Sequence, residues 1–158
     1  MLTYRQYLSE LFDAKVPYRW IGTGDPYERR ATFVVGDDTY VVTLDAGVEA
    51  DVPQKATPWV VSFYLQEPNG SENYMLTHQH QDVVFEVGAA VMAVVTDFIK
   101  KYRPASVEFG AEEEERIPLY RKILPLLARR TGYVVDRQAD SPDIFRVLRP
   151  GFTPQRLD

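Results

Sequence analysis

One long apolar segment constrains the fold more than any other feature. Residues 83–102 read VVFEVGAAVMAVVTDFIKKY, and only Glu86 and Asp97 interrupt the apolar residues before the two terminal lysines. A helix that is apolar around most of its circumference is buried around most of it. Asp82 is suited to cap the start of this helix, the lysines suit the negative end of its dipole, and Pro104 prevents its continuation. We therefore expect a central helix packed on a sheet.

The segments before this helix have the pattern of an antiparallel meander. Short runs rich in β-branched and aromatic residues are typical of strands. They occupy residues 18–21, 29–35, 39–44 and 59–65. Gly36-Asp37-Asp38 is a tight-turn signal, so the second and third runs are predicted to form a hairpin. Loops are expected at 22–26 and 67–77, and the apolar spacing at positions 4, 7, 8, 11 and 12 predicts a first amphipathic helix over residues 2–12.

The segments after the central helix predict one more strand, one more helix and a closing hairpin. Residues 106–109 read as a strand and 117–130 as an amphipathic helix. Because a helix separates residues 106–109 from the last strand of the meander, we expect these two strands to run parallel. The closing strands are expected at 133–136 and 144–148, after Gly132 ends the second helix in a left-handed conformation.

Prolines and acidic residues make specific predictions for this second helix. Pro118 fits a first turn, whereas Pro125 lacks an N–H inside the helix and is expected to kink or split it near Lys122. The acidic run Glu112–Glu115 is interpreted as the start of the helix and Arg129-Arg130 as its end, because both charges complement the helix dipole.

The element order and the composition indicate one α+β domain over residues 1–158, with a loosely held tail from about residue 150. A chain of 158 residues without cysteine has neither disulfides nor a thiolate metal site nor a cysteine nucleophile. A domain of this length buries roughly two-thirds of its unfolded surface, so it needs no covalent staple.

Charge and hydropathy exclude several classes of partner. The formal net charge is −5, and the basic residues are scattered, so nucleic acid is not the expected partner. The longest apolar run is far shorter than the roughly 20 residues that span a bilayer, so we expect a soluble protein without a membrane partner. Arg5 and Glu10 interrupt any apolar core of a signal peptide, which predicts that the chain stays in the compartment where it is made.

The predicted order of strands and helices resembles that of the GNAT (N-acetyltransferase) superfamily over nearly the whole chain. The run from Val107-Glu108-Phe109 through Arg116-Ile117-Pro118-Leu119-Tyr120 to Gly132-Tyr133 is similar to the strand-to-helix segment of that superfamily. The resemblance implies that Tyr120, an aromatic hydroxyl on the helix, acts as a general acid. The alternative, which the helical spacing favours, is a tyrosine packed on the buried face with its hydroxyl at the rim. Together with residues 82–109, the same run resembles small GNAT-like proteins encoded by bacteriophages.

The resemblance also implies an acyl-CoA pyrophosphate site where the fourth strand leads into the central helix, in a Gln/Arg-x-x-Gly-x-Gly/Ala pattern. A helix N-terminus offers free N–H groups to phosphate, and the small residues allow a close approach to the backbone. The corresponding residues here are Gln79, His80, Gln81, Asp82, Val83 and Val84. Asp82 and Val84 take the places of the small residues, and a carboxylate repels a diphosphate while a branched side chain fills the space. The expected cofactor is therefore none, with acetyl-CoA as the alternative.

Two other groups of residues are weaker candidates. His78, His80 and Asp82 follow an alternating spacing that suits a transition metal, but such groups more often belong to a solvated loop, so no metal is expected. The segment Gly22–Pro26 resembles part of a phosphate loop but lacks its lysine, and it is interpreted as a turn.

The aromatic content favours a protein partner. Ten tyrosines and two tryptophans are many for this length, and Tyr18 and Trp20 lie close together in the first strand. Such side chains bury a large area at low entropic cost, although packing in the core is an equally open explanation. The leading hypothesis is a non-catalytic, phage-type module that binds protein or self-associates, as a virion component or a host-directed factor in the cytoplasm. The alternative is an N-acyltransferase with an atypical pyrophosphate loop.

Overall fold

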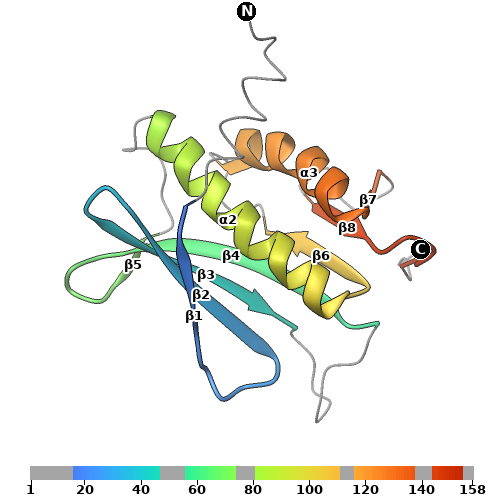
Figure 1. Cartoon of the computed structure of the whole chain (residues 1–158), viewed down its shortest axis with the longest axis horizontal. Coiled ribbons are helices and arrows are strands. Elements are labelled where there is room, and N and C mark those ends of the chain that lie inside the picture. The colour runs from blue at the N-terminus through green and yellow to red at the C-terminus, as the bar shows by residue number, and fades with distance from the viewer. Residues whose placement is uncertain (1–15, 47–55, 74–80, 111–115, 138–143, 155–158) are drawn as a thin grey trace, which may run out of the picture.

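The structure is a computed structural model that describes residues 16–46, 56–73, 81–110, 116–137 and 144–154 (Figure 1). The strands are β1 (Tyr18–Ile21), β2 (Glu28–Val35), β3 (Asp38–Asp45), β4 (Pro58–Gln66), β5 (Glu72–Asn73), β6 (Ser106–Phe109), β7 (Val134–Val135) and β8 (Phe145–Leu148). The helices are α2 (Gln81–Tyr102) and α3 (Ile117–Thr131). The fold is therefore mixed α+β, as the sequence predicts.

All eight strands belong to one sheet in the order β1-β2-β3-β4-β6-β8-β7, with β5 paired to the end of β4. The predicted hairpin is confirmed: β2 and β3 are antiparallel and joined by two residues, of which Gly36 has φ +62°. A positive φ at the first residue of such a loop suits glycine, which has no Cβ to clash. Every strand pair is antiparallel except β4 and β6, which are parallel as expected.

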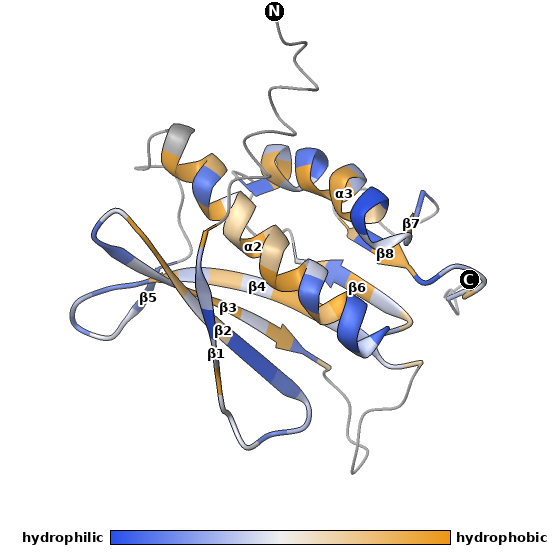
Figure 2. Cartoon of the chain, viewed as in Figure 1, coloured by the Kyte–Doolittle hydropathy of each residue, from blue (hydrophilic) through white to orange (hydrophobic). Residues whose placement is uncertain are grey.

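Both helices pack on the same face of the sheet. In β4, Trp59, Val61 and Phe63 point to this face and are fully buried. Their neighbours in β6 are Val107 and Phe109, which the parallel register aligns with Trp59 and Val61. Figure 2 shows hydrophobic residues along much of α2 and along α3, and one continuous cluster of buried side chains joins both helices to the sheet. The opposite face is not covered by a described helix, and it exposes Val34 and Val60.

Several boundaries differ from the predictions. The segment predicted as a loop over 67–77 contains β5, whose Glu72 pairs with Gln66 of β4. Helix α2 spans Gln81–Tyr102, so Asp82 lies inside it, and the residues that precede Gln81 lie outside the described part of the chain. A carboxylate is stabilised by the helix dipole in the first turn as well as at the cap, which explains why sequence alone does not separate the two positions.

Helix α3 also corrects two expectations. It runs without interruption from Ile117 to Thr131 with Pro125 inside it, so the proline does not split it. Pro125 is exposed, whereas Leu124 and Leu127 beside it are buried, and their packing holds the helix across the missing hydrogen bond. The first turn contains no acidic residue, because the helix begins after the run Glu112–Glu115. That run, the predicted helix over residues 2–12, and the end of the tail lie outside the described residues.

The helix ends follow the sequence. Gly132 ends α3 with φ +78°, and its N–H donates to the carbonyl of Ala128, as expected for a left-handed cap. Lys100 and Lys101 lie in the last turn of α2. In the described part of the chain, no helix is both long enough and apolar enough to cross a membrane.

Candidate functional site

The predicted pyrophosphate site falls at the start of α2. Gln79 and His80 lie outside the described residues, as does His78 of the weak metal pattern. Gln81 and Asp82 form the first turn of the helix, and Val83 and Val84 are half-buried against the core. Val84 therefore contributes to packing. Among the described residues, no three His, Asp or Glu side chains are grouped as a metal site.

The sheet directs both helix starts to one edge. Because β4 and β6 are parallel, their carboxyl ends point the same way; α3 follows β6 in the chain, whereas β5 lies between β4 and α2. The two strands pair only from Pro58 to Val61, while β4 continues to Gln66 and takes β5 as its neighbour.

Tyr120 lies behind this edge and is part of the core. Its side chain is 1% exposed, and its hydroxyl oxygen is buried as well. The rings of Phe109, Phe145 and Phe63 surround it, with centroids 5.3, 5.8 and 6.4 Å from its own. A general acid must come within hydrogen-bond reach of its substrate. In this structure, the Tyr120 hydroxyl oxygen is buried away from the solvent.

Arg116 is a residue that sequence reasoning did not single out. It precedes α3, is 1% exposed, and places its guanidinium carbon 3.9 Å from the ring centroid of Phe63. A buried arginine is rare and is stabilised here in part by this cation–π contact. The sequence carries no signal for it, because its burial depends on β4 and α3 meeting in space.

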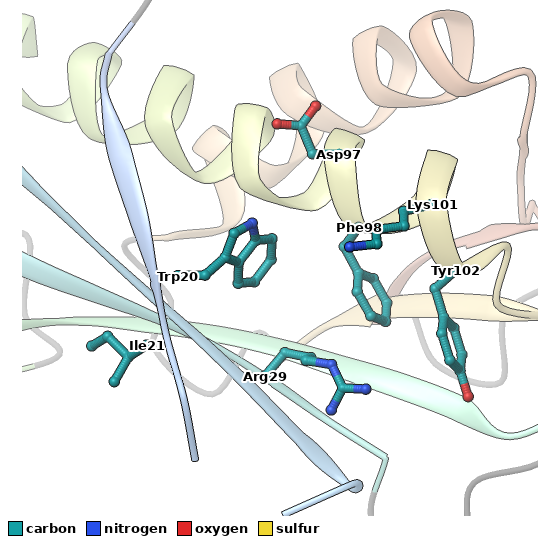
Figure 3. A pocket seen from close by; sticks show the side chains of 7 residues that line it. All are labelled: Trp20, Ile21, Arg29, Asp97, Phe98, Lys101 and Tyr102. Carbon is teal, nitrogen blue, oxygen red and sulfur yellow. The ribbon is translucent and has the colours of Figure 1, made fainter. Parts of the chain in front are cut away.

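The structure places a pocket at the other end of α2, about 24 Å along the helix axis from Gln81. Its volume is about 490 Å³, and it lies between β1, the start of β2 and the last turns of α2 (Figure 3). The lining residues are Trp20, Ile21, Arg29, Asp97, Phe98, Lys101 and Tyr102. None of these residues belongs to the predicted pyrophosphate site. The pocket contains Trp20, one of the aromatic residues that suggested a protein partner.

Aromatic rings lie on two sides of the pocket. Phe98 and Tyr102 are stacked with centroids 5.3 Å apart, and both rings meet the edge of buried Trp59, at 5.0 and 5.4 Å. The Nε1 hydrogen of Trp59 is buried without a hydrogen-bond partner among the described residues. On the opposite side, Trp20 is 42% exposed and meets Tyr18 edge to face at 5.7 Å.

The three charged side chains of the pocket, Asp97, Arg29 and Lys101, differ in their hydrogen-bond partners. The Tyr18 hydroxyl donates a hydrogen bond to the Asp97 carboxylate. Burial, followed by this carboxylate, raises the pKa of Tyr18 well above its usual value, so the proton stays on the tyrosine. Arg29 Nη1 donates to the carbonyl oxygens of Glu28 and Pro26 at 3.1 and 3.4 Å, which fixes the guanidinium. Lys101 is exposed and makes no ion pair within the described part of the chain.

The pocket therefore presents two cations and one carboxylate that is already engaged by a hydroxyl. The remaining surface is aromatic and aliphatic. Such a pocket favours a ligand with an apolar body and a negative charge.

Comparison with known proteins assigns no family to this chain. No family model matches the chain, and no curated protein sequence matches it significantly.

Proposed function

We propose that this chain is a non-catalytic module with a GNAT-like fold that acts by binding a protein. The observation that carries the proposal is the exposed pair Trp20 and Ile21, at 42% and 37% exposure, beside an open aromatic pocket. Large aromatic side chains that remain accessible at a hollow are typical of the centres of protein interfaces. The partner is another protein or a second copy of this chain, with neither nucleic acid nor membrane involved.

Two further observations support this proposal. The sheet order, with a meander on one side of the parallel β4–β6 pair and a hairpin on the other, matches the element order on which the GNAT resemblance rests. The candidate general acid, Tyr120, is enclosed by three phenylalanine rings. By the same resemblance, we place the chain among the phage-encoded proteins, acting in the host cytoplasm or within the virion.

The alternative is an acyl-CoA-dependent N-acetyltransferase. One observation favours it: α2 begins at the edge to which the carboxyl ends of β4 and β6 both point, where a helix N-terminus offers free N–H groups to phosphate. Asp82 and Val84 in the first turn oppose it, through charge and through bulk. Under this alternative, the cofactor is acetyl-CoA and Tyr120 must become accessible during turnover.

Quantitative capture from an extract of the cells in which the protein is naturally made tests the proposal. Immobilised wild-type chain is compared with Trp20→Ala and with Val34→Ala, a control on the opposite face whose side chain is 58% exposed. We expect a partner that Trp20→Ala retains about tenfold less well and that Val34→Ala retains fully. Equal retention by the two variants contradicts the proposal. Size-exclusion chromatography with light scattering identifies the case in which the partner is a second copy.

A further inference from the structure

The proposed function leaves open what chemistry the partner brings to the pocket. Figure 3 shows Trp20 on one side, Phe98, Lys101 and Tyr102 on the other, and the guanidinium of Arg29 below the space between them. Aromatic groups on opposite sides of an open space suit a flat apolar side chain, because offset and edge-to-face contacts between rings are favourable. The volume of about 490 Å³ is within the usual range for ligand pockets.

The charged residues of the pocket indicate the charge of the ligand. The whole chain carries a net charge of −5, yet the free charge at this pocket is positive, from Lys101 and Arg29. Asp97 adds one negative charge to the lining, because the Tyr18 hydroxyl that donates to it stays neutral, so the two cations and one carboxylate leave the pocket with a net positive charge. A local positive potential on an acidic protein selects an anionic group in the ligand.

We infer that the pocket binds an acidic segment of the partner protein, in which an aromatic side chain is followed by carboxylates. The aromatic side chain enters between Trp20 and Phe98, and the carboxylates face Lys101 and Arg29. This inference rests on the proposed function, because it names the chemistry of the partner at the same surface. In a peptide, neighbouring residues supply an aromatic ring and a carboxylate. These two groups can therefore contact the rings and the cations of the pocket, which also lie close together.

The test uses the full chain labelled with nitrogen-15 and the probe acetyl-Gly-Phe-Asp-Glu-Gly-amide. The chain has two tryptophans, so two indole N–H signals report on exposed Trp20 and buried Trp59, and Trp20→Phe assigns them. We expect a saturable shift of the Trp20 signal. The neutral probe acetyl-Gly-Phe-Asn-Gln-Gly-amide is expected to bind about tenfold more weakly, a difference that corresponds to the loss of close charge pairs.

A matched pair of charge reversals on α2 localises the effect. Lys101 lines the pocket and Lys100 does not, although both are exposed, adjacent and change the net charge equally when replaced by glutamate. Lys101→Glu is expected to weaken the acidic probe about tenfold and to strengthen acetyl-Gly-Phe-Lys-Lys-Gly-amide, while Lys100→Glu leaves both nearly unchanged. Equal effects of the two reversals, equal binding of the acidic and neutral probes, or an unmoved Trp20 signal each overturn the inference.

The outcomes separate this inference from the proposed function. If Trp20→Ala abolishes capture of the partner but the acidic probe does not bind, the proposed function stands and the acidic segment is wrong. If the probe binds as expected but capture does not depend on Trp20, the pocket chemistry is right and the proposed function is wrong. Binding of phenylacetate with no binding of the acidic probe assigns the pocket to a small aromatic acid and overturns the peptide.

Discussion

The hydrogen bond from Tyr18 to Asp97 joins two distant parts of the chain beside the pocket. It links the edge strand β1 to the helix α2 across 79 positions of sequence. Because Trp20 follows two residues later on the same face of β1, this bond also sets how far Trp20 lies from Phe98. A single hydroxyl thus helps to hold the two sides of the pocket together.

Replacing Tyr18 by phenylalanine is expected to destabilise the protein by about 1 kcal/mol at neutral pH, the usual net value of one hydrogen bond. The pKa of Tyr18 is raised in the folded state, so its contribution to stability is complete below the unfolded pKa of about 10 and is lost as the pH rises above it. Urea unfolding at pH 8 and pH 10.5 checks this.

The stability difference between wild type and Tyr18→Phe should be smaller at the higher pH. Tyr102→Phe is the control in the same pocket, since the Tyr102 hydroxyl makes no hydrogen bond within the described residues, and it should leave stability nearly unchanged. A Tyr18→Phe difference that grows with pH would show that the hydroxyl does not donate to Asp97.

At the scale of single elements, α3 shows how packing overrides a local preference. Pro125 lacks the N–H that would donate to the carbonyl of Arg121, and its ring crowds that carbonyl. The helix nevertheless continues, because Leu124 and Leu127 are buried on the side that faces the sheet. Replacing this proline by a residue with an N–H is therefore expected to stabilise the protein.

Pro125→Ala is expected to raise the free energy of unfolding by about 1–3 kcal/mol, since it restores one helical hydrogen bond at an exposed position. Pro118→Ala is the matched control: Pro118 is also exposed but lies in the first turn, where an N–H has no helical acceptor. Denaturant unfolding of the two variants measures both changes in the free energy of unfolding. A larger gain at Pro118 than at Pro125 would contradict this explanation.

The elements also show what the sequence can and cannot predict. Periodicity and turn residues located β2, β3, β4, α2 and α3 closely, because these signals are local. Short β5 escaped prediction, since two residues become a strand only by pairing with Leu65 and Gln66 of β4. At Pro125, local preference predicts a kink or a split of the helix, and the structure shows that the helix is not split.

The candidate sites divide in the same way. The sequence predicted both helices and so placed Tyr120 on a helix, and it identified Tyr18 and Trp20 as aromatic residues of interest. It did not predict the pocket, because the lining residues of β1, Trp20 and Ile21, are 76–82 positions away in sequence from those of α2, which lie within Asp97–Tyr102. It also did not predict the burial of Arg116. Both depend on contacts between distant segments, for which a single sequence holds no direct signal.

At the scale of the whole molecule, the two ends of α2 support different functions. Its start lies where the GNAT resemblance implies a pyrophosphate, and there the first turn carries Asp82 and Val84. Its end forms the aromatic pocket with Arg29 and Lys101. We assign the proposed function to the second end. The two ends of α2 belong to one helix that packs on the sheet. Both candidate functions are therefore tested in the intact chain.

Calorimetric titration of the intact chain with acetyl-CoA tests the central claim most directly, because the claim is that no acyl-CoA enzyme operates here. We predict no heat of binding at millimolar ligand, because a carboxylate and a branched side chain occupy the turn that would receive the diphosphate. Micromolar affinity, together with acetyl transfer that Tyr120→Phe slows without weakening binding, would contradict it.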